Sequence, residues 1–311
     1  MITRKPMPLD IRTSDYNNCN VHEYTPYIIT KNDKLLLDAD WWDSLSVISR
    51  ELIVKNTNGL FKLGTVKVPH EVQQHKLLTL MYQSYLDGFD YNIWYSPDIP
   101  NGPRNVKVIK LSNATKRSFL DRNVDELDIF KAQIAEHMEP NTSYFVKLSS
   151  TSGKNEKAIE PLNDPSLIIQ RLISIDIFHQ REYLRAKDTY LILIPWNDMI
   201  VDGNEFRIFV VNDKVTAASP QRWWELYQYS QDELDAVEHA LNNVEFIGKV
   251  PYSTFVADVY IDMITKTCHL IELNPFGAHS GAGASLFNWI TDYDVLHGIS
   301  QPELRYLSAI N

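Results

Sequence analysis

Apolar and polar residues alternate along the chain with two different periods. Apolar residues three and four positions apart predict helices, and short apolar runs bounded by turn residues predict strands. Helices are predicted at 41–54, 71–87, 124–137 and 232–243, and another opens at 166–171. Strands are predicted at 106–111, 144–148, 190–194, 205–211, 214–218, 255–261 and 267–273. Because several strands follow one another across tight turns, the pattern predicts an α+β fold with antiparallel strand pairs.

The length of the chain predicts more than one lobe. At 311 residues, the chain exceeds the size at which a single hydrophobic core usually stops growing. Strand signals are dense only in the second half. We therefore divide the chain into a divergent N-terminal region at 1–140 and a core at 141–311.

Charge and cysteine usage argue against several classes of protein. The formal net charge of −10 and the isoelectric point near 5.4 disfavour a protein whose main task is to grip DNA or an anionic membrane. Cys19 and Cys268 are far apart and suggest neither a disulfide framework nor a zinc site. The chain has no apolar run near the ~18 residues of a membrane helix, and its N-terminus lacks the apolar stretch of a signal peptide. We therefore expect a cytoplasmic protein without a DNA or membrane partner.

Oxygen-bearing side chains interrupt the last two predicted strands. Asp258 lies in one apolar strand, while Glu272 and Asn274 lie two residues apart on the next and so share one face. Antiparallel pairing through the turn at 263–267 brings the three together. Two carboxylates and an amide are hard oxygen ligands that suit Mg²⁺ held together with substrate phosphates. The alternative is that Glu272 and Asn274 lie on the solvent face of an edge hairpin.

A lysine followed by a serine-rich loop is a second candidate feature. Lys147 lies in the strand at 144–148, and the loop at 149–154 contains Ser149 and Ser152. An ammonium group on a strand suits contact with phosphate oxygens, and backbone N–H groups of such a loop suit the same role. Lys147 would fit an exposed edge strand equally well, so this feature alone does not decide.

A third feature is a charged pair of strands. Glu205 and Arg207 alternate with apolar residues in one strand, and Gln221 and Arg222 end the next. One interpretation is an exposed cross-strand ion pair worth under ~1 kcal/mol. The other is a pair of arginines that clamps a phosphate or a substrate carboxylate through planar guanidinium groups.

These features, in their order, resemble the cell-division-cycle-123 family of ATP-grasp proteins. The resemblance covers about residues 140–300, and the ordered set is specific although each piece is common. The matching motifs are Lys147 in the strand VKLSS, Glu205-Phe-Arg207, Ser219-Pro-Gln-Arg222, Asp258-Val-Tyr-Ile-Asp262, Glu272-Leu-Asn-Pro-Phe-Gly277, Leu286-Phe287 and Trp289.

The resemblance implies an ATP-grasp fold, in which two α+β lobes with antiparallel sheets enclose a nucleotide cleft. It implies ATP and Mg²⁺ as cofactors, with the metal held by Asp258, Glu272 and Asn274. The backbone at 191–194 would lie beside the adenine. The implied catalytic residues are Lys147, Arg207 and Arg222. The implied nucleotide contacts are Lys147, Ser149, Ser152, Leu193, Ile194, Trp196, Glu205, Arg207 and Gln221.

The sequence also departs from the family pattern. Ile194 and Pro195 stand where the family has basic residues before the hinge tryptophan, which puts an adenine-side contact in question. Glu272 replaces the usual Asp but keeps an oxygen ligand, and Pro220 interrupts a Ser-Gln-Arg run. Residues 1–130 do not match the N-terminal lobe of the family.

Two functions share the implied ATP site. ATP-grasp enzymes join a carboxylate to an amine through an acylphosphate, whose charge Mg²⁺ and Lys147 would neutralise. Eukaryotic members of the family are ATP-dependent assembly factors for translation initiation factor 2. Because residues 1–130 do not match the assembly factors, the sequence slightly favours an ATP-dependent ligase or protein-modifying enzyme with an unknown carboxylate or protein substrate. The alternative is an assembly factor whose partner is a translation initiation factor, and a degenerate binding module without nucleotide is the least favoured.

Overall fold

The structure, a computed structural model, describes the second half of the chain almost completely and the first half in part. The described residues are 3–7, 27–29, 35–38, 61–64, 88–121, 127–149, 160–174, 188–277, 282–289 and 291–308. The helices predicted at 41–54 and 71–87 lie outside these ranges. A small sheet near the N-terminus contains β2 (Tyr27–Ile29), β3 (Leu35–Asp38) and β4 (Phe61–Gly64).

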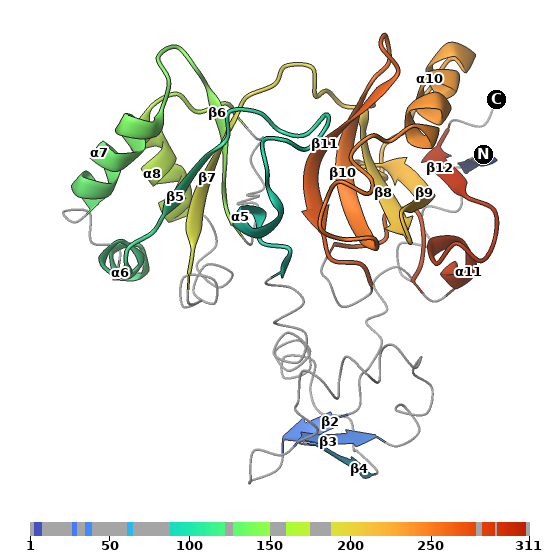
Figure 1. Ribbon diagram of the computed structural model, residues 1–311, viewed down its shortest axis with the longest axis horizontal. Coiled ribbons are helices and arrows are strands. Elements are labelled where there is room, and N and C mark those ends of the chain that lie inside the picture. The colour runs from blue at the N-terminus through green and yellow to red at the C-terminus, as the bar shows by residue number, and fades with distance from the viewer. Residues whose placement is uncertain are drawn as a thin grey trace.

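The smaller lobe is a three-stranded antiparallel sheet with helices packed on one face (Figure 1). Its strand order is β5-β7-β6. A single apolar cluster joins the sheet to the helices and explains why their apolar positions repeat with helical spacing. The elements are β5 (Lys107–Lys110), α6 (Asn113–Asp121), α7 (Leu127–His137), β6 (Tyr144–Leu148), α8 (Pro165–Ser174) and β7 (Tyr190–Pro195).

The predicted division at residue 140 falls between α7 and β6. In the structure, β5 precedes this point and β6 follows it, yet both pair with β7. Residues on the two sides of the division therefore share one sheet. The extent of the N-terminal region stays a prediction.

The larger lobe contains a six-stranded sheet in the order β1-β12-β9-β8-β10-β11. Neighbouring strands in the run β9-β8-β10-β11 are antiparallel, as predicted. In contrast, β12 runs parallel to both β1 and β9. The sheet is therefore mixed. No tight turn connects β12 to β1 or to β9, so these pairs are free to run parallel. The elements are β1 (Thr3–Met7), β8 (Glu205–Val211), β9 (Lys214–Pro220), α10 (Gln231–Asn242), β10 (Phe255–Asp262), β11 (Thr267–Asn274), α11 (Tyr293–Leu296) and β12 (Glu303–Leu307).

Alternation along β8 and β10 gives the larger sheet one face packed in the main core and a second face, called here the polar face, that carries Arg207 and Asp258 beside the buried apolar residues Phe209 and Val256. Phe206, Ile208 and Val259 are fully buried in the cluster that also contains the apolar residues of α10. Arg207 and Asp258 lie between such residues in sequence and therefore face the other way. The alternation of apolar and polar residues that predicted these strands thus also determines which side chains face the site.

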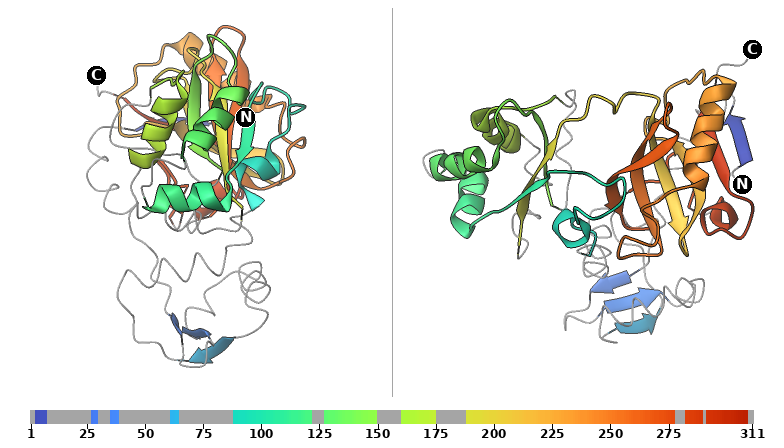
Figure 2. Two further views of the ribbon diagram at one scale, coloured as in Figure 1. Left: turned by 90° about the vertical axis from the view of Figure 1, so that its left-hand side faces the viewer. Right: turned by 45° about the horizontal axis from the view of Figure 1, so that its top comes forward.

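A short helix, α5 (Tyr91–Trp94), lies between the two lobes (Figures 1 and 2). The sequence predicted a loop at 91–104 because this segment contains three prolines and a glycine. One helical turn forms there because Tyr91 and Trp94 are buried in the core of the larger lobe. Burial outweighs local propensity at this position.

Candidate functional site

The polar centre of the larger sheet is built by β10 and β11. Their antiparallel pairing, predicted from the sequence, places Asp258 opposite Glu272 and Val256 opposite Asn274. The register shifts between Asp258 and Val259, as a β-bulge requires. This irregularity keeps Glu272 on the face of Asp258, while Leu270 and Leu273 are buried in the core.

Asp258 is held by three neighbouring side chains. Arg207 donates two hydrogen bonds to its carboxylate, from Nε to Oδ1 at 2.8 Å and from Nη2 to Oδ2 at 3.0 Å. Gln221 Nε2 donates to Oδ2 at 3.2 Å, and Asn274 Nδ2 donates to the same oxygen at 3.4 Å. Burial alone would lower the pKa of the Arg207 guanidinium, but the charge of Asp258 and the hydrogen bonds to it raise that pKa. Arg207 is therefore positively charged throughout the physiological range.

Lys147 joins the two lobes at this site. It lies on β6 of the smaller lobe, and its ammonium group forms a hydrogen-bonded ion pair with Oε1 of Glu272 on β11. The side chain of Lys147 is 2% exposed and that of Glu272 is 24% exposed. The strand β6 lies at the edge of its described sheet, but Lys147 is buried there, so the exposed position that the sequence also allowed is not the one found. A buried ammonium group needs a countercharge, and Glu272 supplies it across the lobe boundary.

The structure does not bring Arg222 to this cluster. Its guanidinium donates to Asp202 at 2.8 Å and to Glu225 at 3.3 Å, and its side chain is 48% exposed. The predicted pair of arginines facing one ligand is therefore not formed, because the chain turns away after Gln221. Glu205 lies opposite Tyr260, two residues along β8 from Arg207 and therefore on the same face.

The predicted nucleotide contacts of the smaller lobe have mixed surroundings. The backbone N–H group of Ser149 donates to Tyr190, its carbonyl accepts from Tyr91, and its hydroxyl accepts from the Tyr190 N–H group at 3.4 Å. Ser149 is thus engaged within the protein, and Ser152 lies outside the described residues. The side chain of Leu193 is buried in the core of the smaller lobe.

The predicted hinge is the end of β7. Residues 190–193 pair with β5 on one side, and residues 191–195 pair with β6 on the other. Ile194 and Pro195 therefore extend beyond β5. Ile194 is half-buried beside the larger core, and Trp196 Nε1 donates to Asp198 at 2.8 Å. One edge of β7 near Ile194 is consequently without a strand neighbour in the described part of the sheet.

The donor set fits Mg²⁺ held with phosphates better than Mg²⁺ alone. Among the described residues, no three His, Cys, Asp or Glu side chains gather in a metal-binding group. Asp258 and Glu272 supply two carboxylates, and Asn274 supplies an amide whose oxygen faces Asp258 if the group turns. Magnesium ordinarily keeps several positions for water or substrate oxygens, so two carboxylates suffice when phosphates complete the shell.

Five buried side-chain atoms of the described residues have no hydrogen-bond partner, and two of them belong to Gln221 and Tyr91, which contact the cluster. Gln221 holds Asp258 through its nitrogen, but its oxygen has no partner in the described structure. The Ser285 hydroxyl also has no partner, and it lies two residues after Gly283, whose carbonyl accepts a 3.5 Å hydrogen bond from Arg207. The other such atoms in the described residues all belong to α5. They are Tyr91 Oη, Asn92 Oδ1 and Trp94 Nε1.

Buried unpartnered polar atoms are rare in folded proteins and indicate a missing partner. Sequence analysis did not identify Tyr91 or Ser285. Tyr91 stands in a segment whose prolines predict only a loop, and Ser285 shows no spacing that would mark it.

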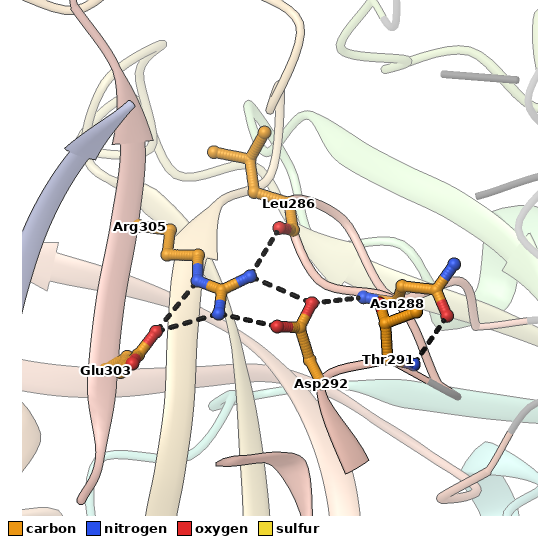
Figure 3. A network of polar contacts seen from close by, with 6 residues as sticks. All are labelled: Leu286, Asn288, Thr291, Asp292, Glu303 and Arg305. Atoms are coloured by element: carbon orange, nitrogen blue, oxygen red, sulfur yellow. Dashed lines mark hydrogen bonds and ion pairs between the residues drawn. The ribbon is translucent and has the colours of Figure 1, made fainter. Parts of the chain in front are cut away.

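Contacts of Arg305, called here the tether, tie the described residues 282–289 and 291–292 to β12 (Figure 3). Arg305 on β12 donates to both carboxylate oxygens of Asp292, at 2.9 and 2.7 Å, and to Glu303 at 2.9 Å. It also donates to the Leu286 carbonyl at 3.3 Å and lies 4.2 Å from the centroid of the Phe287 ring. The tether fixes the segment that contains the carbonyl contacted by Arg207.

Known proteins match parts of this chain. The model of the D123 family matches residues 167–311. The cell division cycle protein 123 of Candida glabrata is 28% identical over 130 residues, which are 41% of this chain and 35% of that protein. A protein of Vanderwaltozyma polyspora named translation initiation factor eIF2 assembly protein is 29% identical over 108 residues, which are 34% of this chain and 28% of that protein. The matched part thus covers about a third of the length of these relatives.

A solved structure extends the likeness to the fold. Cdc123 of Schizosaccharomyces pombe superposes with a TM-score of 0.57 at 19% identity, covering 72% of this chain and 97% of that chain. At this identity, the likeness shows a shared fold and no more.

The protein is an α+β protein with two lobes, and a charged site lies where their sheets meet. The predicted fold class is confirmed. The resemblance seen in the sequence is confirmed as well: the D123 family model matches residues 167–311, and cell division cycle proteins 123 are similar to part of this chain. No helix in the described ranges combines the length and apolar character needed to cross a bilayer.

Proposed function

We propose that this chain binds MgATP where Lys147 meets Glu272, and that it acts as an ATP-dependent assembly factor for a translation initiation factor. One observation carries the nucleotide part: an ion pair between the lobes, Lys147 with Glu272, lies in the same cluster as the ion pair of Arg207 with Asp258. Two buried polar atoms without a partner, Gln221 Oε1 and Tyr91 Oη, belong to residues that contact this cluster. The charges of these two ion pairs cancel, so the pairs need no ligand for neutrality. The cluster nevertheless offers both positive and negative groups to a ligand that carries charges of both signs.

MgATP is such a ligand, because it combines a divalent cation with anionic phosphates. Asp258, Glu272 and Asn274 would hold Mg²⁺, and the metal would neutralise phosphate charge. Lys147 would exchange its bond to Glu272 for one to a phosphate oxygen. Arg207 would keep Asp258 oriented, since its guanidinium forms two hydrogen bonds with that carboxylate.

The assembly function is supported by the relatives rather than by the geometry. The protein of Vanderwaltozyma polyspora that matches this chain is named as an assembly protein for the initiation factor eIF2. The ligase reading, which the sequence slightly favoured, relied on Arg207 and Arg222 jointly orienting a carboxylate. Arg222 is instead bound to Asp202 and Glu225, so the described site lacks that clamp.

Nucleotide binding is tested by calorimetric titration of the protein with MgATP. The wild-type chain and Arg222→Gln are expected to bind equally, because Arg222 lies outside the cluster. Asp258→Asn is expected to weaken binding at least ~10-fold, since it removes a metal ligand charge and the partner of Arg207. Equal binding by Asp258→Asn would show that the metal lies elsewhere.

The assembly function needs a separate test with purified partners. Immobilised protein is incubated with the purified subunits of translation initiation factor 2, with and without MgATP, and ADP release is followed in parallel. Retention of one subunit that depends on MgATP would support the proposal. Failure to retain any subunit, together with ADP release stimulated by amino acids or peptides, would favour a ligase.

A further inference from the structure

The helix α5 contributes a residue to the candidate site that no sequence motif indicated. Its first residue, Tyr91, donates its backbone N–H group to the Ser149 carbonyl at 2.9 Å, which fixes it to the end of β6. The same helix packs against β11 of the larger lobe. Tyr91 is therefore held at the junction from which Lys147 and Glu272 reach one another.

The ring of Tyr91 already contacts the charged cluster. Lys147 Nζ lies 5.7 Å from the centroid of the ring, within the range of a cation–π contact. The ring is 1% exposed, and it also packs against Trp94 with centroids 4.5 Å apart. A phenylalanine would make all of these contacts, so they do not account for the hydroxyl.

The hydroxyl itself has no partner among the described residues. Tyrosine hydroxyls normally find a hydrogen-bond partner when they are buried, because removing one from water without a replacement is costly. Burial, followed by the charges of Tyr95 and Glu272, raises the pKa of Tyr91. The phenol therefore keeps its proton at neutral pH and is a hydrogen-bond donor in need of an acceptor.

We propose that Tyr91 is a ligand-binding residue of the site, whose hydroxyl donates a hydrogen bond to a phosphate oxygen of the bound nucleotide beside Lys147. This inference rests on the proposed nucleotide binding. A phosphate oxygen is the expected acceptor because Lys147, which contacts the ring, is the cation that a phosphate would engage. The phenol would be a neutral donor next to that charged one.

Tyr91→Phe isolates the hydroxyl, because it keeps the ring and the contact with Lys147. The variant is expected to bind MgATP about 10-fold more weakly, the usual effect of losing a hydrogen bond to a charged group. The melting temperature of the ligand-free variant is expected to be equal to or above that of the wild type. Tyr95→Phe is the matched control, since its ring stacks on Tyr91 with centroids 5.3 Å apart. It is expected to bind like the wild type.

Titration with magnesium tripolyphosphate and with adenosine assigns the contact to one part of the nucleotide. The difference between wild type and Tyr91→Phe is expected with tripolyphosphate and absent with adenosine. A difference confined to adenosine would overturn the phosphate assignment.

Two further results would overturn the proposal. Equal MgATP affinity of Tyr91→Phe and wild type would show that the hydroxyl is not in the site. A lower melting temperature of the ligand-free variant would show that the hydroxyl is bonded within the protein. If the wild-type chain itself binds no MgATP, the proposed function fails first, and this outcome is distinct from the other two.

Discussion

Lys147 and Glu272 form an ion pair whose two ends belong to different lobes. Such a pair contributes little net stability, because the cost of removing both charges from water offsets their attraction. Breaking one end is a different matter, since the other charge then stays buried alone. Lys147 is the more deeply buried partner. Removing Glu272 should therefore lower the free energy of unfolding by more than the intact pair contributes to it.

Glu272→Gln is therefore expected to lower the free energy of unfolding by roughly 2–3 kcal/mol, somewhat below the range for a fully buried pair because Glu272 is 24% exposed. The double variant with Lys147→Met should recover most of this loss, because it removes the stranded ammonium group. Urea denaturation of the wild type, both single variants and the double variant measures the coupling.

The exposed ion pair of Lys107 with Glu139 provides the control. Glu139 is 51% exposed, so Glu139→Gln should change the free energy of unfolding by less than ~1 kcal/mol. Glu272→Gln with the stability of wild type would mean that Lys147 has a second countercharge.

At the residue scale, the sequence predicted side chains that local strand pairing brings together. Asp258, Glu272 and Asn274 were predictable because one short turn joins their strands and alternation fixes their face. Arg222 was misplaced because the same alternation was extended past the end of β9, where the chain no longer follows a strand. Tyr91 could not be predicted, since its place depends on a contact with Ser149, far away in sequence.

At the scale of elements, the described residues 282–289 and 291–296 cover part of the polar face. Phe287, Val295 and Leu296 pack on Phe209 and Val256 of the sheet. Arg305 fastens the segment at Asp292, so the apolar cover and the tether act on one piece of chain (Figure 3). The local stability of this segment should therefore depend on the tether.

Asp292→Asn removes the carboxylate that receives both prongs of Arg305. We expect a loss of about 2 kcal/mol in the free energy of unfolding, because Arg305 keeps Glu303 as a countercharge. Hydrogen exchange followed by mass spectrometry should show faster exchange in the peptides that cover 283–296. Asp294→Asn, at an exposed position of α11, should leave both quantities unchanged. Unaltered exchange in Asp292→Asn would mean that apolar packing alone holds the segment.

A histidine at the end of α11 gives this region a dependence on pH. His297 stacks on Tyr293 with ring centroids 3.9 Å apart and meets the Phe276 ring edge-on. Burial lowers its pKa from the ordinary value of 6.5, so the unfolded chain binds the proton more readily. Its contribution to stability is present above pH 6.5 and is lost as the pH falls through the folded pKa.

Replacing His297 by Phe should reduce the fall in melting temperature between about pH 7 and pH 5, because the variant has no imidazole to bind a proton at that position. His239→Gln, at an exposed position of α10, should keep the wild-type slope. A slope unchanged by His297→Phe would assign the pH dependence to other groups.

Most elements of the described core were predictable because each is encoded by a local period. The predicted strands and the helices that became α7, α8 and α10 all formed. The parallel pairing of β1 with β12 and of β12 with β9 was not predicted. It joins distant segments, and only tertiary packing brings those together. Helix α5 was missed for a related reason, since buried aromatic side chains stabilise it against its local sequence.

At the scale of the whole molecule, the two lobes meet through a cluster that is already neutral. Adding Mg²⁺ alone would place a divalent cation beside Lys147 and Arg207, and adding ATP alone would place phosphates beside Asp258 and Glu272. Each ligand alone meets like charges that nothing compensates. In the proposed site, the metal would bind the carboxylates and the phosphates would bind Lys147, so the two ligands should bind with positive coupling.

This coupling predicts how the melting temperature responds to the ligands. MgATP at 100 times its dissociation constant should stabilise the wild-type chain by about 2.7 kcal/mol, whereas Mg²⁺ or ATP at the same concentrations should give shifts whose sum is clearly smaller. Lys147→Met should lose most of the joint shift, because the variant has no ammonium group to bind the phosphates. Arg222→Gln should keep the joint shift, since Arg222 is bound to Asp202 and Glu225. Additive shifts in the wild-type chain would mean that the metal and the phosphates occupy separate sites.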